Sequence, residues 1–128
     1  MNGIDMAKSM RDRSYCPYSN FRVGACIEFE NGEFVGGNNV ENSSYGLTVC
    51  AERVAVFSAI SLGKDLKKAI CLYISTDSST LTPPCGACLQ VLSEFWDDLK
   101  IVLCNNDESK EFTLNELLPT KFSKDNMN

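Results

Sequence analysis

Histidine is absent from this chain of 128 residues, so we expect any zinc site in the chain to be built from cysteine thiolates. Long apolar runs are also missing, and no stretch approaches the roughly 20 residues that a membrane span needs. We therefore expect no membrane partner. The 12 basic residues are scattered among 17 acidic ones, which leaves a net charge of −5. Without a basic cluster to bind phosphates, nucleic acid is not an expected partner either.

The first five residues lack the charged and then apolar pattern of a secretory signal, which indicates a cytoplasmic protein. Seven cysteines are many for this length, but their number is odd and the expected compartment is reducing. We therefore predict three metal ligands and four free thiols that pack as small hydrophobic side chains. The four packing thiols would be Cys16, Cys26, Cys71 and Cys104.

The chain has the length of one domain, residues 1–128. Thr48 is expected to cap a helix over 50–62, and Gly63 is expected to end it. Residues 125–128 are expected to form a frayed tail. Helices alternating with strands predict a three-layer α/β domain, in which helices sandwich a mixed sheet of about five strands. Periodicity and turn residues predict, in order, a helix over 3–13, a hairpin of strands 21–30 and 33–39 around Asn31-Gly32, a helix over 50–62, a strand over 69–76, a helix from Cys85, a strand over 100–104, a short strand over 111–113 and a last short helix opening at Thr113.

Three cysteines and a glutamate form the most informative pattern, Cys50-Ala51-Glu52 followed by Pro84-Cys85-Gly86-Ala87-Cys88. Cys85-x-x-Cys88 alone is also typical of redox and structural metal sites. A helix that begins there would place both sulfurs on one face, and the N-terminus of a helix stabilises thiolates. Three thiolates would leave the fourth tetrahedral position of Zn²⁺ open to water, as in catalytic zinc sites.

This pattern resembles that of zinc-dependent nucleobase deaminases in their three-cysteine form. From about Tyr15 to Phe122, the chain is similar to cytidine deaminases of the small homotetrameric type. The similarity is carried by five segments in order, PYSNFRVGA (17–25), GNNVENSSYG (37–46), CAER (50–53), PPCGACLQVL (83–92) and ELLPTKF (116–122). It implies a cytidine deaminase-like fold with one Zn²⁺ per subunit, held by Cys50, Cys85 and Cys88.

The implied activity is hydrolytic deamination of cytidine and deoxycytidine to uridine and deoxyuridine in pyrimidine salvage. Glu52 would be catalytic, carrying protons from the attacking water to ring nitrogen N3 and to the departing amine. Without its place beside Cys50, Glu52 would be interpreted as a solvated helix residue.

The resemblance also implies substrate-binding residues and a shared active site. Phe21 would stack on the pyrimidine, and the backbone around Ala51 would read the base edge. Asn39 and Glu41 would bind the ribose 3′-hydroxyl. Tyr45 and Phe122 would reach the site of a neighbouring subunit in a homotetramer. Taken alone, the two phenylalanines would be interpreted as core aromatics, and Asn39 and Glu41 as polar residues that follow a strand.

Two features depart from the family pattern. Leu89 stands where related proteins usually have an arginine that helps to neutralise the thiolates. Because Zn²⁺ with three thiolates carries a net charge of −1, we expect Arg53 to supply the compensating charge. The N-terminal helix is also short for the family.

Two other functions remain open on the sequence alone. The same chemistry could act on a cytosine-bearing antibiotic such as blasticidin S, or on a base within a polynucleotide, which the acidic charge disfavours. A non-catalytic module stabilised by zinc would instead close the site with a fourth cysteine and would have no use for Glu52.

Overall fold

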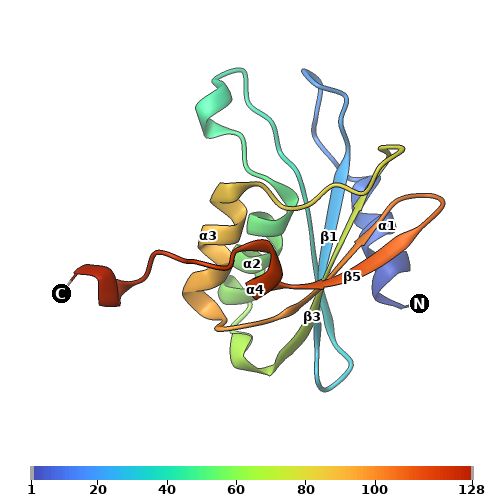
Figure 1. Cartoon of the computed structure of the whole chain (residues 1–128). Coiled ribbons are helices and arrows are strands. Elements are labelled where there is room, and N and C mark those ends of the chain that lie inside the picture. The colour runs from blue at the N-terminus through green and yellow to red at the C-terminus, as the bar shows by residue number, and fades with distance from the viewer. Residues whose placement is uncertain (1, 128) are drawn as a thin grey trace.

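The architecture is a five-stranded mixed sheet, seen in a computed structural model that describes residues 2–127 (Figure 1). The strand order is β2-β1-β3-β4-β5, with β3 and β4 parallel and the other pairs antiparallel. The strand bounds are β1 Val23–Phe29, β2 Phe34–Asn38, β3 Ala69–Thr76, β4 Lys100–Cys104 and β5 Ser109–Thr113. This arrangement confirms the predicted mixed α/β sheet.

Helices cover both faces of the sheet and make three layers (Figure 1). Helix α1 (Gly3–Arg11) lies on one face, whereas α2 (Ala51–Ser61) and α3 (Gly86–Phe95) lie side by side on the other. A short α4 (Leu114–Leu117) follows β5. Three 3₁₀ turns complete the described elements, η1 Tyr45–Leu47, η2 Leu66–Lys68 and η3 Lys124–Met127. None of the helices in residues 2–127 combines the length and the apolar character that crossing a membrane would demand.

The main core lies between the sheet and the α2–α3 layer. Alternate residues of β1, the buried apolar residues of α2 and the apolar stripe of α3 belong to it. Three of the four cysteines predicted to pack are fully or almost fully buried, and only Cys16 is partly accessible. The core residues that β1 and α3 contribute include Ala25, Ile27, Phe29, Leu89, Leu92 and Trp96.

Gly37 on β2 brings helix α2 close to the sheet. A Cβ atom at this position would lie 2.4 Å from the Ala55 nitrogen and 2.8 Å from the Ala51 carbonyl oxygen. Since real side chains do not tolerate such distances, the glycine is needed where the first turn of α2 crosses the strand. The contact holds the start of α2 beside the ends of the central strands.

The start of β1 and the end of β3 lie next to each other, because Val23 pairs with Thr76 in the antiparallel register. The parallel connection from β3 to β4 passes through α3, which begins after this end of β3. In α/β sheets, ligands bind outside the carboxyl ends of such strands. This edge of the sheet is where the starts of α2 and α3 meet.

The predicted elements are all present, but several boundaries differ. Thr48 does not cap α2, because its hydroxyl accepts a hydrogen bond from the Asn42 amide and the helix begins only after Cys50. Strand β5 is longer than predicted, since its exposed first half pairs with β4. Residues 125–127 of the predicted tail belong to the 3₁₀ turn η3 (Lys124–Met127), and the last residue, Asn128, lies outside the described residues.

Candidate functional site

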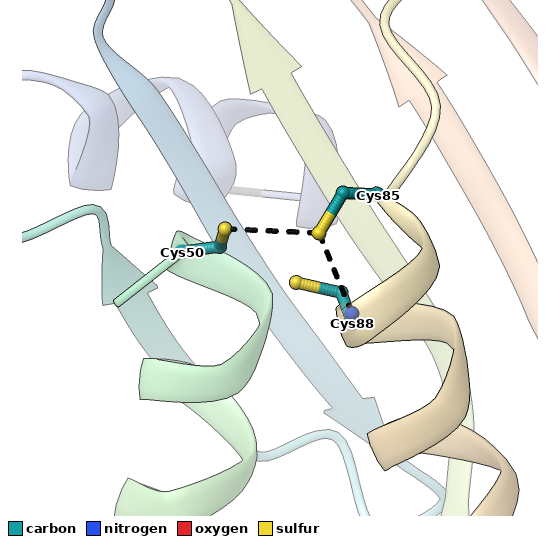
Figure 2. A group of neighbouring side chains, drawn as sticks. All are labelled: Cys50, Cys85 and Cys88. Atoms are coloured by element: carbon teal, nitrogen blue, oxygen red, sulfur yellow. Dashed lines mark hydrogen bonds between the residues drawn. The ribbon is translucent and has the colours of Figure 1, made fainter. Parts of the chain in front are cut away.

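The three cysteines of the sequence pattern converge at the starts of two helices (Figure 2). Cys50 is the residue before α2, Cys85 is the residue before α3, and Cys88 lies in the first turn of α3. Their sulfur atoms all lie within 4.8 Å of one another, and the Cys50 and Cys85 sulfurs are 4.0 Å apart. Within residues 2–127, no carboxylate and no other cysteine joins this group.

The sulfur triad fits a tetrahedral zinc ion. Zinc–sulfur bonds of about 2.3 Å place tetrahedral sulfurs about 3.8 Å apart, close to the separation found between Cys50 and Cys85. A soft all-thiolate set also selects zinc over hard cations such as Mg²⁺. Of the seven cysteines, all within residues 2–127, only these three come together, so the fourth sulfur that a closed structural site requires is not supplied.

The surroundings of the sulfurs favour a thiolate at Cys50 but not at Cys88, whose pKa is raised by its hydrogen bond with Cys50 and by burial. The Cys88 amide donates a hydrogen bond to the Cys85 sulfur at 3.5 Å, so this side chain caps α3. The pKa of Cys50 is lowered, mainly by a hydrogen bond from the Cys88 thiol and then by the Arg53 guanidinium. Metal binding requires deprotonated sulfur, so Cys50 is the ligand that these contacts prepare for a cation.

Arg53 lies against the triad, one turn after Cys50 on α2. Its Nη2 donates to the Cys50 sulfur at 3.4 Å, and this contact raises the pKa of the guanidinium. Its buried Nε finds no hydrogen-bond partner within residues 2–127. Leu89, which stands in the place of the usual arginine, is buried in the hydrophobic core instead. Arg53 is therefore the cationic side chain that touches the sulfurs.

Glu52 is a buried carboxylic acid beside the triad, only 5% exposed. Burial raises the pKa of Glu52 to about 7, and the charge of the Cys50 thiolate adds to this effect. A carboxyl group whose pKa is close to neutral can both accept and donate a proton. Its position in the first turn of α2 brings it to the same cavity as two of the sulfurs.

A cavity of about 180 Å³ brings most of the predicted site residues together. Its walls come from the start of β1, the end of β3, the start of α2 and the loop before α3. Of the residues that the sequence singled out, those in its lining are Phe21, Asn39, Cys50, Ala51, Glu52 and Cys85. Thr76, Thr82 and Pro83 line it as well.

Glu41 and Tyr45 lie in a second, more open cavity of about 360 Å³, which shares Thr48 with the first. The Glu41 carboxylate and the Asn39 amide both make hydrogen bonds inside the chain, to residues 18–23. Phe122 lines neither cavity. Its side chain is 60% exposed on the C-terminal segment that leads away from the helices (Figure 1).

Three threonines that were not predicted as site residues line the main cavity, Thr48, Thr76 and Thr82. Thr76 and Thr82 face each other with their hydroxyl oxygens 3.3 Å apart. Thr76 was counted only as the last residue of a buried strand. Its place at the carboxyl end of that strand was the signal that could have identified it.

Comparisons with known proteins agree with this arrangement. Residues 2–104 match the family model described as the cytidine and deoxycytidylate deaminase zinc-binding region. A cytidine deaminase from Halalkalibacterium halodurans is 42% identical over 127 residues, which are 98% of this chain and 95% of that protein. The crystal structure of cytidine deaminase from Burkholderia pseudomallei superposes with a TM-score of 0.89 at 39% identity, covering 94% of this chain and 96% of the other.

A blasticidin-S deaminase from Bacillus cereus is a more distant relative, 31% identical over 108 residues, which are 80% of this chain and 77% of that enzyme. Relatives named for both kinds of substrate therefore match most of this chain. The matched region includes all three cysteines, Glu52 and the sheet edge at which they meet. The chain belongs to the cytidine and deoxycytidylate deaminase family.

Proposed function

We propose that this protein catalyses the zinc-dependent hydrolytic deamination of cytidine and deoxycytidine to uridine and deoxyuridine, with release of ammonia. The observation that carries the proposal is that the buried Glu52 carboxyl group shares one cavity with Cys50 and Cys85, two members of the sulfur triad. The curated relatives named cytidine deaminase, which match nearly the whole chain, support the choice of substrate. We further propose that residues 1–128 form one such domain.

Cys50, Cys85 and Cys88 would hold the Zn²⁺ ion, one per subunit. When bound, the ion supplies Lewis-acid activation of water for attack on C4 of cytosine. Glu52 takes the proton of the attacking water and delivers protons to ring nitrogen N3 and to the departing amine, so the overall reaction consumes one water and releases one ammonia. Its near-neutral pKa suits a group that must gain and lose a proton in each cycle.

The remaining walls of the cavity would orient the pyrimidine. Phe21 offers an exposed ring for stacking, and the main chain at Ala51 offers hydrogen bonds to the base edge. Glu41, from the second cavity, and Asn39, from the main cavity, would recognise the sugar. The net charge of −5 disfavours a polynucleotide substrate.

A direct assay tests the proposal. Purified protein with bound zinc is incubated with cytidine, deoxycytidine, cytosine and blasticidin S, while ultraviolet absorbance and released ammonia are followed. We expect the two nucleosides to be deaminated much faster than the free base or the antibiotic. Faster turnover of blasticidin S would assign the chain to the antibiotic-modifying branch, and no turnover of any substrate would contradict the proposal.

Arg53 is expected to help retain zinc. The Arg53→Ala variant should bind zinc about tenfold to hundredfold more weakly, because it removes the cation next to the Cys50 sulfur and no arginine follows Cys88. Competition with a chelator measures the affinity. Arg13→Ala, at an exposed position, is the control, and equal zinc affinity of the two variants would refute the role of Arg53.

We also propose that the protein assembles as a homotetramer with shared active sites. Apolar side chains on the outer side of α2 and on the 40–49 segment line an open surface depression, in keeping with a self-association surface. The members include Val40, Val49, Val54, Phe57 and Leu62. Tyr45 and Phe122, both largely exposed, would each reach the cavity of a neighbouring subunit.

Deleting residues 121–128 is expected to impair the enzyme, because the deletion removes Phe122 from the neighbour's site. KM for cytidine should rise by about threefold to tenfold, the contribution of one aromatic contact, or the assembly should dissociate. Steady-state kinetics and light scattering measure the two effects. Deleting only 125–128 is the control, and a fully active monomer lacking 121–128 would refute shared sites.

Thiolate ligands need a reducing environment, which supports a cytoplasmic location for the enzyme. Its place in metabolism would be pyrimidine salvage, where nucleosides are the substrates.

A further inference from the structure

A tight turn carries Phe21 to the cavity. Residues 16–20 form this turn, in which the Asn20 amide donates a hydrogen bond of 2.9 Å to the Cys16 carbonyl oxygen. Asn20 has a φ of 58°, a left-handed conformation that asparagine tolerates better than most residues. The chain enters β1 only at Val23, so the sheet does not fix the backbone of Phe21.

Side chains fix Phe21 instead. The Phe21 amide donates to the Ser19 Oγ at 3.0 Å, and the Phe21 carbonyl oxygen accepts from the Asn39 Nδ2 at 2.8 Å. The Asn39 Oδ1 also accepts from the Val23 amide at 3.0 Å. Both backbone polar groups of the predicted stacking residue are thus bound by side chains.

The Ser19 hydroxyl makes a second contact, because it donates a hydrogen bond to the Oε2 of Glu41. The Glu41 Oε1 accepts from the Tyr18 amide at 3.0 Å and from the Ser19 amide at 3.1 Å. These donors, Ser19 foremost, lower the pKa of Glu41. The carboxylate is therefore ionised and held in place, and about one of its roughly four acceptor positions is left for a ligand.

We infer that Ser19 is a positioning residue that couples sugar recognition by Glu41 to base recognition by Phe21. Its hydroxyl joins the two, since it donates to the carboxylate and accepts from the Phe21 amide. The inference rests on the proposed function, in which Glu41 and Phe21 touch the substrate. Neither the family comparison nor the spacing of the sequence motifs assigns a role to this serine.

The physical advantage is preorganisation. An aromatic ring on a turn outside the sheet loses conformational freedom when a substrate stacks on it, and this loss weakens binding. With the Phe21 backbone already fixed, the loss is smaller. A substrate hydroxyl that binds Glu41 also meets a carboxylate that does not have to reorient. The benefit falls on substrate affinity rather than on proton transfer, which Glu52 performs elsewhere in the cavity.

Kinetics provide the first test. We expect Ser19→Ala to raise KM for cytidine about tenfold and to change kcat by less than about twofold. Ser19→Thr retains the hydroxyl and should restore the wild-type KM. The control is Ser93→Ala, which removes the hydroxyl of a half-buried serine on α3 that donates to the Gln90 carbonyl oxygen, outside both cavities. An unchanged KM in Ser19→Ala, or a change confined to kcat, would overturn the inference.

Amide hydrogen exchange provides a test that does not depend on catalysis. In the free protein, the Phe21 amide should exchange about threefold to tenfold faster in Ser19→Ala than in the wild type, while the Val23 amide, which is held by Asn39, should be unaffected. Equal exchange at Phe21 would overturn the inference. If the wild-type protein did not deaminate cytidine, the proposed function would fail, but the exchange rates would still decide whether Ser19 fixes Phe21.

Discussion

Replacing Glu52 with glutamine is expected to reduce kcat for cytidine by at least about 10²–10⁴-fold while zinc stays bound at one ion per chain. The amide has nearly the shape of the carboxyl group, so the buried site, in which Glu52 is 5% exposed, should keep its packing. An amide cannot accept the proton of the attacking water or deliver it to N3. Stopped-assay kinetics and metal analysis of the same preparation measure the two quantities.

Glu94→Gln is the matched control, since this glutamate is exposed on α3 and carries no predicted role. It should turn over cytidine at the wild-type rate. If Glu52→Gln retained full activity, the assignment of Glu52 as the proton carrier would be wrong. If it lost zinc together with activity, Glu52 would have to be a ligand instead.

Replacing Cys85 with alanine is expected to remove zinc and activity together. The site has three sulfurs, and the remaining two, Cys50 and Cys88, cannot fill three corners of a tetrahedron. After dialysis against a chelator, the zinc content should fall to about a tenth of that of the wild type or less. Because Cys85 is exposed and lies before α3, the fold should survive, which circular dichroism can verify.

Cys16→Ala is the control for this experiment, because Cys16 is also partly accessible but lies outside the triad. It should keep its zinc and its activity. A zinc-loaded and active Cys85→Ala variant would show that the metal centre lies elsewhere. Loss of activity with full zinc content would show that Cys85 acts on the substrate and not on the metal.

Local sequence signals predicted the elements well where side chains decide the local backbone. Asn31-Gly32 predicted the hairpin, and Gly32 has the positive φ of 88° that such a turn requires. Thr113 and Glu116 predicted a capping box, and both of its hydrogen bonds are present. The boundary at Thr48 was wrong, because the same hydroxyl bonds to the Asn42 amide, a contact that spacing alone does not reveal.

The candidate site was predicted unevenly for the same reason. The Cys-x-x-Cys pair follows from helical spacing, so its two sulfurs were placed correctly from the sequence. For Asn39 and Glu41, the sequence predicted binding of the ribose 3′-hydroxyl but not the hydrogen bonds that both side chains make to residues 18–23. These hydrogen bonds form because the turn at residues 16–20 lies beside the end of β2, and no local sequence pattern predicts that contact.

The sequence by itself determined the ligand chemistry of this protein, because residue types do not depend on the fold. Without histidine, cysteine sulfur and carboxylate oxygen were the side-chain donors left for zinc, and Cys50, Cys85 and Cys88 with Glu52 formed the pattern that predicted a catalytic zinc ion. The tertiary structure alone decided how these groups meet. Packing of α2 and α3 on one face of the sheet brings sulfurs 35 positions apart in the chain to within 4.0 Å, and burial gives Glu52 its near-neutral pKa. Distances between segments and the loss of solvent are properties of the packed chain, so only the folded molecule contains them.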